Sequence, residues 1–175
     1  MQPLPHNTAL LVIDVHRGCD EAGAIMGRGR RNNPAMEENI GRLEEAWRAS
    51  GRPIMRVQHD SRWPGAPTHY SAFVGTYLEA ELLRRGVGTL VLTGLATDRC
   101  VSTTARLAAN FGFATYVVAD ATATFDRLGP PPDGRRHAAE DVHAVALAEL
   151  NGEFALIVDT DAVLEAAGVS PGAAA

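Results

Sequence analysis

Lysine is absent from this chain of 175 residues, and all 16 of its basic side chains are arginines. A bias in coding composition explains this most simply, since alanine, glycine and arginine are all abundant. The absence nevertheless has a chemical consequence, because no step of binding or catalysis can use a lysine side chain.

Long apolar runs and cysteines are also scarce. No run approaches the roughly 18 apolar residues that a membrane span needs, and the first 15 residues lack the basic segment and long apolar stretch of a signal peptide. The two cysteines, Cys19 and Cys100, are too few for a disulfide scaffold in a chain of this length. We therefore expect a cytoplasmic protein with free thiols.

Excess positive charge is missing too, since the formal net charge is −5. This argues against a nucleic-acid partner and against a polybasic membrane surface. The composition, with 46% hydrophobic and 21% charged residues, is that of an ordinary globular protein. The length suits one domain over residues 1–175, with a core over about 8–167 and a flexible tail over 168–175.

Short apolar runs alternate with amphipathic segments along the chain. The alternation predicts an α/β fold with three αβα layers around a mostly parallel, doubly wound sheet of about five strands. The expected strands are 8–15, 53–58, 89–94, 114–119 and 154–158, and the expected helices are about 34–50, 76–85, 99–111, 137–150 and 162–167.

Residues typical of helix caps precede three of these helices. Asn33 is expected to cap the first, and Thr76 with Glu79 forms a capping-box pattern at the second. Asp98 or Thr97 is expected to cap the third.

Two reactive side chains follow neighbouring predicted strands. Ligands of such sheets bind beyond the carboxyl ends of the strands, where the strand order reverses. Asp14 ends the first strand, and Cys100 lies a few residues beyond the 89–94 strand in a first helical turn, which favours the thiolate. They form a candidate base and nucleophile, although a buried structural cysteine and a loop-capping aspartate remain alternatives.

Several stretches together resemble the isochorismatase-like cysteine hydrolase superfamily. The most specific is GLATDRCVSTTAR at 94–106. The other stretches are TALLVIDVHRG at 8–18, HDSRWPG at 59–65, SAFVGT at 71–76 and AEDVHAVALAELNGEFA at 139–155. The resemblance covers most of residues 8–158 and implies the isochorismatase-like fold.

The resemblance also implies roles for particular residues. Cys100 takes the position of the family's nucleophile, and Asp14 takes that of its general base. A non-proline cis peptide bond is implied between Leu95 and Ala96, with the N–H groups of Ala96 and Cys100 forming an oxyanion hole.

The chain departs from the family pattern at the third catalytic residue, a lysine. Typical members carry it shortly before the SAFxGT segment, on a strand of its own, in a stretch that this chain lacks. We therefore expect one edge strand to be missing, with the 53–58 strand left at the edge of the sheet. The pocket wall built by the absent stretch would be lost as well.

Candidate replacements for the lysine and candidate substrate-binding residues lie in nearby loops, and for each a solvated or core-packing role is the alternative. They are His16, His59, Arg62, Trp63, His69, Phe73 and Phe125. A metal site is not expected, because His59-Asp60-Ser61 does not match the Asp-x-His pattern of nicotinamidases, and no cofactor motif is present.

The sequence thus predicts a cysteine-dependent hydrolase of a small amide or related C–N bond, acting through a thioacyl intermediate. Alternatives are a divergent member that catalyses a non-hydrolytic biosynthetic step or only binds a ligand, a vinyl-ether hydrolase that uses the aspartate alone, and a structural oligomer partner. The expected partners are a small-molecule substrate and further copies of the chain, as a dimer or tetramer. No nucleic acid and no membrane are expected.

Overall fold

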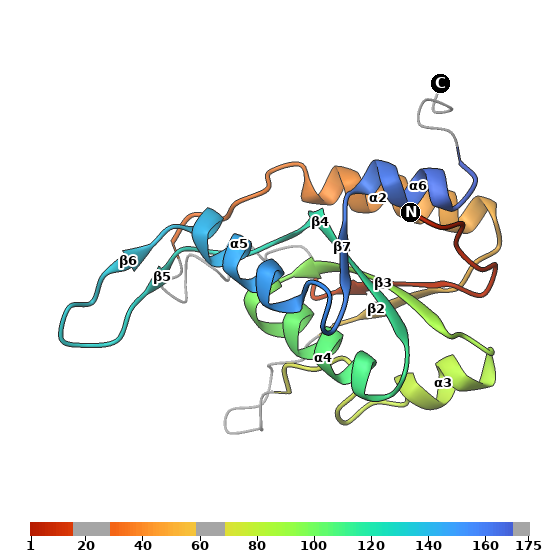
Figure 1. Ribbon diagram of the computed structural model, residues 1–175, viewed down its shortest axis with the longest axis horizontal. Coiled ribbons are helices and arrows are strands. Elements are labelled where there is room, and N and C mark those ends of the chain that lie inside the picture. The colour runs from red at the N-terminus through yellow and green to blue at the C-terminus, as the bar shows by residue number, and fades with distance from the viewer. Residues whose placement is uncertain (16–28, 59–68, 170–175) are drawn as a thin grey trace.

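The computed structural model describes residues 1–15, 29–58 and 69–169, and five parallel strands form its central sheet (Figure 1). The strand order is β2-β1-β3-β4-β7, and every neighbouring pair is parallel. The strands are β1 (Ala9–Ile13), β2 (Ile54–Val57), β3 (Thr89–Leu95), β4 (Ala114–Ala123) and β7 (Leu156–Val158). The predicted fold class and the edge position of the 53–58 strand are confirmed.

Helices cover both faces of this sheet, which gives the three predicted layers (Figure 1). On one face lie α2 (Met36–Ala49) and α6 (Thr160–Ala166). On the other lie α3 (Leu78–Arg84), α4 (Ser102–Asn110) and α5 (Ala139–Leu150). A single π-helical turn, η1 (Thr97–Val101), joins β3 to α4.

Two apolar clusters hold these layers together, one on each face of the sheet. All residues of β1 and β3 are buried, as expected for central parallel strands. On the α2 face, Trp47 is fully buried, and its indole N–H donates to the carbonyl of Thr8 at 3.0 Å. The central strands, from which the candidate residues emerge, are therefore rigidly packed on both sides.

A small β-hairpin extends from the body between β4 and α5 (Figure 1). Its strands, β5 (Arg127–Leu128) and β6 (Arg136–His137), pair in antiparallel fashion, and they were not predicted. Two-residue strands give too short a pattern for periodicity to reveal. Residues 129–135 form the tip of this hairpin.

The predicted helix caps are wrong at all three helices, and at the first and third of them distant partners take the capping side chains. Asn33 is not the cap of α2, since it donates to the carbonyls of Ala119 and Thr122 on β4. Tyr77 occupies the cap position of α3, and the Thr76 hydroxyl instead accepts from the Leu78 N–H at 3.2 Å.

At the third helix, Asp98 and Thr97 lie inside η1 and do not cap it. Their side chains bind residues of other elements. Cys100 accordingly belongs to a π-helical turn that leads into α4 rather than to the first turn of α4 itself.

Glycine is required near the carboxyl end of β3. Gly94 has φ +109, and a Cβ atom there would lie 2.0 Å from the carbonyl oxygen of Ile13 on β1. Both the backbone conformation and the close approach exclude a side chain. This contact brings the end of β3 against the end of β1 immediately before Asp14.

Replacing Gly94 with alanine is expected to lower the free energy of unfolding by about 3 kcal/mol or more, because the new Cβ atom forces β1 and β3 apart. Urea denaturation monitored by circular dichroism measures this. Gly88→Ala is the matched control, since a Cβ atom there would meet no other atom within 4 Å and its φ is not positive. Equal stability of the two variants would contradict the role given to Gly94.

Candidate active site

A pocket of about 250 Å³ lies at the carboxyl ends of β1 and β2 and beside η1. The strand order reverses between β1 and β3, and parallel sheets bind ligands at such points. Asp14 follows β1 and Cys100 lies in η1 after β3, so the pocket adjoins this reversal. Its described lining residues are Ile13, Asp14, Val57, Gln58, His69, Tyr70, Ser71, Ala72, Val74, Gly75, Thr76 and Cys100. The pocket thus contains both Asp14 and Cys100, as the strand-end rule predicts.

Asp14 occupies the first position after β1 and has a left-handed backbone conformation, with φ +53. This conformation is uncommon outside glycine, although aspartate tolerates it better than most residues. The Asp14 N–H donates to the carbonyl of Val57 at 2.8 Å, which ties the turn to the edge strand. The carboxylate is therefore placed in the pocket by a locally strained turn, of the kind that is common at functional sites.

Cys100 lies in η1, half-buried, and packs against the apolar cluster on the α4 face. Ala96, which is buried, precedes the turn, and its carbonyl accepts from the N–H groups of Arg99 at 2.9 Å and Val101 at 3.2 Å. The Leu95–Ala96 peptide bond is cis, as the family resemblance implies. Cys100, the candidate nucleophile, thus lies in the hydrogen-bonded turn that follows the buried strand β3.

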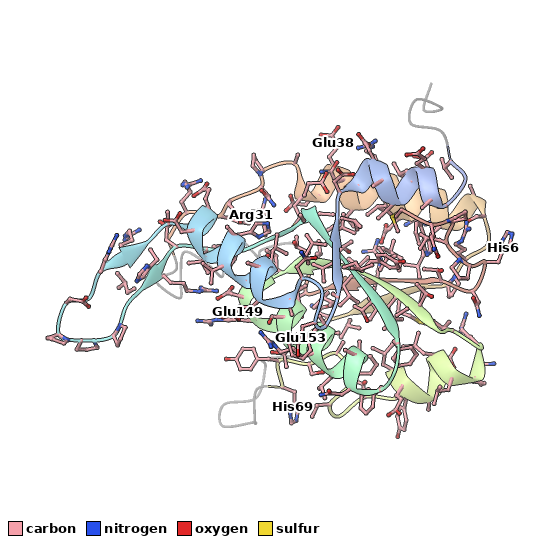
Figure 2. The ribbon with its side chains drawn as sticks, viewed as in Figure 1. His6, Arg31, Glu38, His69, Glu149 and Glu153 are labelled. Atoms are coloured by element: carbon pink, nitrogen blue, oxygen red, sulfur yellow. The ribbon has the colours of Figure 1, made fainter. Side chains whose placement is uncertain are left out.

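The segment 69–76 forms a third wall of the pocket and is fixed to α4. The N–H of Ala72 donates to the Thr104 hydroxyl at 3.0 Å, and the Thr76 hydroxyl donates to the Ala72 carbonyl at 2.7 Å. His69 is exposed and lies on the side of the molecule that carries α3 and α4 (Figure 2). Its ring is next to Gly75, within van der Waals range of where a Cβ would be.

The predicted substrate-binding residues have different surroundings in the structure. His69 lines the pocket. Phe73 and Phe125 are buried in the two apolar clusters and are not among the described lining residues. Phe73 packs on Phe111 and Phe113, with ring centroids 5.2 and 6.0 Å apart, so it anchors the wall from behind. The other candidates, His16, His59, Arg62 and Trp63, lie outside the described residues, as does Cys19.

Sequence reasoning missed several lining residues. Gln58 follows β2 directly, so the strand-end rule that pointed to Asp14 applies to it equally. Ser71, Thr76 and Tyr70 reach the pocket from an irregular segment, which carries no periodicity from which their direction could be inferred.

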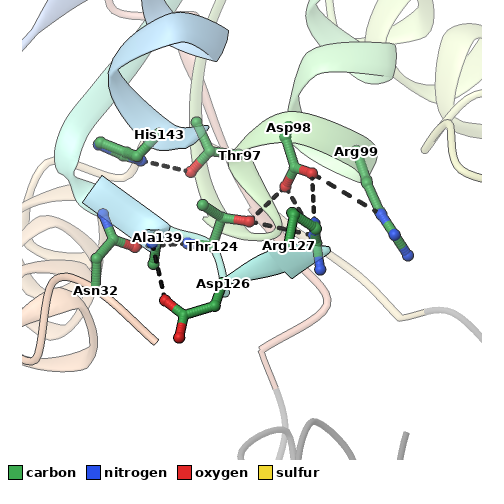
Figure 3. A network of polar contacts seen from close by, with 9 residues as sticks. All are labelled: Asn32, Thr97, Asp98, Arg99, Thr124, Asp126, Arg127, Ala139 and His143. Atoms are coloured by element: carbon green, nitrogen blue, oxygen red, sulfur yellow. Dashed lines mark hydrogen bonds and ion pairs between the residues drawn. The ribbon is translucent and has the colours of Figure 1, made fainter. Parts of the chain in front are cut away.

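A polar network holds η1 on the side of β4 and the hairpin (Figure 3). The Asp98 carboxylate accepts from Arg127 Nε and Nη2, both at 2.9 Å, and from the Thr124 hydroxyl. The side chains of Asp98 and Arg127 are only 19% and 16% exposed. Burial works to raise the pKa of the Asp98 carboxyl, but the hydrogen bonds from Arg127 and Thr124 outweigh it and hold the pKa below its usual value.

His143, on α5, holds the neighbouring residue of the same turn. Its Nδ1 atom lies 2.9 Å from the hydroxyl of Thr97, and a hydrogen bond joins them (Figure 3). Both residues are buried. Burial lowers the pKa of the His143 imidazole below its ordinary value, so the ring is neutral at pH 7.

Within the described parts of the chain, no three histidine, cysteine, aspartate or glutamate side chains lie close enough to hold a metal ion. No helix in those parts is both long and apolar enough to cross a membrane.

Comparison with known proteins assigns the chain to a family. The family model described as "Isochorismatase domain" matches residues 66–162, more than half of the chain. The chain belongs to the isochorismatase family. The matched range begins before the 69–76 wall and includes β3, η1 and the polar network.

Individual relatives agree with this assignment. The uncharacterized isochorismatase family protein YrdC of Bacillus subtilis is 34% identical over 181 residues, covering 89% of this chain and 94% of that protein. The crystal structure of a putative hydrolase of the family from Chromobacterium violaceum superposes with a TM-score of 0.87, at 32% identity, covering 96% of this chain and 97% of that one.

A third relative is named for its activity. The ureidoacrylate amidohydrolase RutB of Methylobacterium radiotolerans is 38% identical over 100 residues, covering 57% of this chain and 34% of that protein. The family to which this chain belongs therefore includes hydrolases.

Folding stability is expected to fall as the pH is lowered from about 7.5 to about 5.5, in part because of His143. The unfolded chain binds a proton near pH 6.5, whereas the buried imidazole resists it, so acid favours the unfolded state. His143→Gln should flatten the dependence of the free energy of unfolding on pH, by less than the one-proton limit of about 1.4 kcal/mol per pH unit. His6→Gln, at an exposed position, is the control and should keep the wild-type slope.

Proposed function

We propose that this protein is a cysteine-dependent hydrolase of small amides or related C–N bonds. The observation that carries the proposal is that Asp14 and Cys100 line one pocket, although 86 positions separate them in the chain. A carboxylate beside a thiol is the arrangement that nucleophilic catalysis by cysteine needs. The pocket volume of about 250 Å³ favours a small substrate.

The reaction proceeds in two halves. Asp14 takes the thiol proton, and the Cys100 thiolate attacks the carbonyl carbon of the substrate. The N–H groups of Ala96 and Cys100 stabilise the resulting oxyanion. The C–N bond then breaks, the amine leaves with the proton from Asp14, and a thioester remains. Asp14 next deprotonates a water molecule, which attacks the thioester and releases the carboxylic acid and the free thiol.

The amidohydrolase name of one relative supports C–N bond hydrolysis as the reaction class. In this chain the family's lysine has no counterpart of the same type. His69 is the one basic side chain among the described residues that line the pocket. We propose that the His69 side chain takes the place in the pocket that the lysine takes elsewhere in the family.

Replacing Cys100 with alanine is expected to reduce turnover by a factor of about 10³ or more, because the covalent route is lost. The measurement is release of ammonia or amine from a panel of small amides and ureido compounds, together with intact-mass detection of an adduct at Cys100. Asp14→Asn should also remove turnover, whereas Ser50→Ala, at the carboxyl end of α2 and outside the described pocket lining, is a control that should keep it.

Two outcomes would contradict the proposal. If Cys100→Ala kept full activity and Asp14→Asn lost it, the cysteine would not be the nucleophile, and hydrolysis of isochorismate would become the reaction to test. If iodoacetamide modified wild-type Cys100 no faster than an ordinary thiol, a binding protein or a non-hydrolytic enzyme would be favoured.

The role of His69 is tested separately. His69→Ala should lower kcat by about tenfold or more, because the basic side chain in the pocket is lost. His69→Lys, which places the family's residue type at this position, should recover much of the loss. If His69→Ala kept the kcat of the wild type, His69 would have no part in the reaction.

A further inference from the structure

The turn that carries Cys100 is held from two directions by side chains that do not line the pocket. Thr97 and Asp98 are adjacent in the chain and lie at the start of η1. Thr97 is bound by His143 of α5. Asp98 is bound by Thr124, which follows β4, and by Arg127, the first residue of β5. Figure 3 shows both sets of contacts side by side.

These two contacts are linked behind the turn into a closed ring. Asp126 lies between Thr124 and Arg127 in the chain, and its carboxylate accepts from the N–H of Ala139, the first residue of α5, at 3.0 Å. His143 is one helical turn further along α5. A hydrogen bond therefore joins the segment that binds Asp98 to the helix that binds Thr97.

The adjacent residues Asn32 and Asn33 add further contacts to this support. The N–H of Thr124 donates to the Asn32 side-chain carbonyl at 2.7 Å. The Asn33 amide donates to the carbonyls of Ala119 and Thr122 and approaches His143 Nε2 at 3.5 Å. Buried polar groups that are fully satisfied in this way rigidify the backbone that they bind.

We propose that Asp98, with its partner Arg127, and His143, through Thr97, are positioning residues that fix the Cys100 turn in its reactive geometry. This inference rests on the proposed function, in which Cys100 is the nucleophile. Neither side chain contacts the substrate in this scheme. They act by holding the backbone of η1, which carries the thiol and the N–H group of Cys100 and directly follows Ala96.

The consequence is catalytic as well as structural, because a nucleophile displaced by a fraction of an ångström loses its alignment with its base and with the oxyanion donors. Loss of either contact should reduce the reactivity of Cys100 in molecules that are still folded. A purely structural role would instead lower the free energy of unfolding and leave the reactivity of the folded protein unchanged.

The test measures alkylation of Cys100 by iodoacetamide between pH 5 and pH 10, with peptide mapping to count Cys19 separately. Two variants break the contacts without changing net charge, namely Thr97→Val and the double variant Asp98→Asn/Arg127→Gln. Thr124→Val removes one donor to Asp98 with little change of shape, so it serves where the double variant fails to fold. Urea titration identifies conditions in which each variant is folded.

Arg42→Gln is the matched control. Arg42, on α2, also forms an ion pair, at 2.6 Å, but its partner is Asp161 on α6, and neither residue belongs to η1 or to its supports. This variant should alkylate at the wild-type rate, within about twofold.

The folded Thr97→Val and Asp98→Asn/Arg127→Gln variants are expected to alkylate about tenfold more slowly at pH 7, with the midpoint of the pH profile raised by about one unit. Wild-type profiles in the folded variants would overturn the positioning role and leave the proposed function standing. A wild-type Cys100 with an ordinary midpoint near pH 8.5 would instead overturn the proposed function and this inference with it.

Discussion

The close approach of β3 to β1 is the constraint on which the candidate site depends. Gly94 lets the two backbones meet where a Cβ atom would lie 2.0 Å from the Ile13 carbonyl. Immediately beyond this contact the strands diverge into two different structures, the left-handed turn at Asp14 and the π-helical turn at Cys100. The carboxylate and the thiol share one pocket because the strands that deliver them are packed without any side chain between them.

The chain pattern was sufficient to predict the fold and to place Asp14 and Cys100 near the carboxyl ends of neighbouring strands. Buried parallel strands give continuous apolar runs, so the five strands, the edge position of β2 and the strand ends at Asp14 and before Cys100 were all readable. The same local rules were wrong at the helix starts. Asn33, Thr97 and Asp98 have the side chains of helix caps, but each is bound by a residue far away in the sequence.

These failures share a physical cause that also explains what else was missed. A side chain such as that of Asp98 can satisfy a nearby backbone N–H or a distant guanidinium, and the choice depends on which elements the fold brings together. The local sequence gives no indication of what His143 and Arg127 bind. His143 lies within α5, and Arg127 is the first residue of the two-residue strand β5. Phe73 and Phe125 were predicted to bind substrate but are buried in the apolar clusters, because proximity to a motif does not show which way a ring points.

The edge position of β2 affects how such a site can change over evolution. Val57 and Gln58 contribute to the pocket from the outermost strand of the sheet, and only one side of that strand is paired within the described sheet. A strand gained or lost there leaves the pairing of β1 with β3 and the packing of both helical layers untouched. The width of the pocket and the number of strands can therefore vary together in a single insertion or deletion, while Asp14 and Cys100 keep their positions at the ends of β1 and β3.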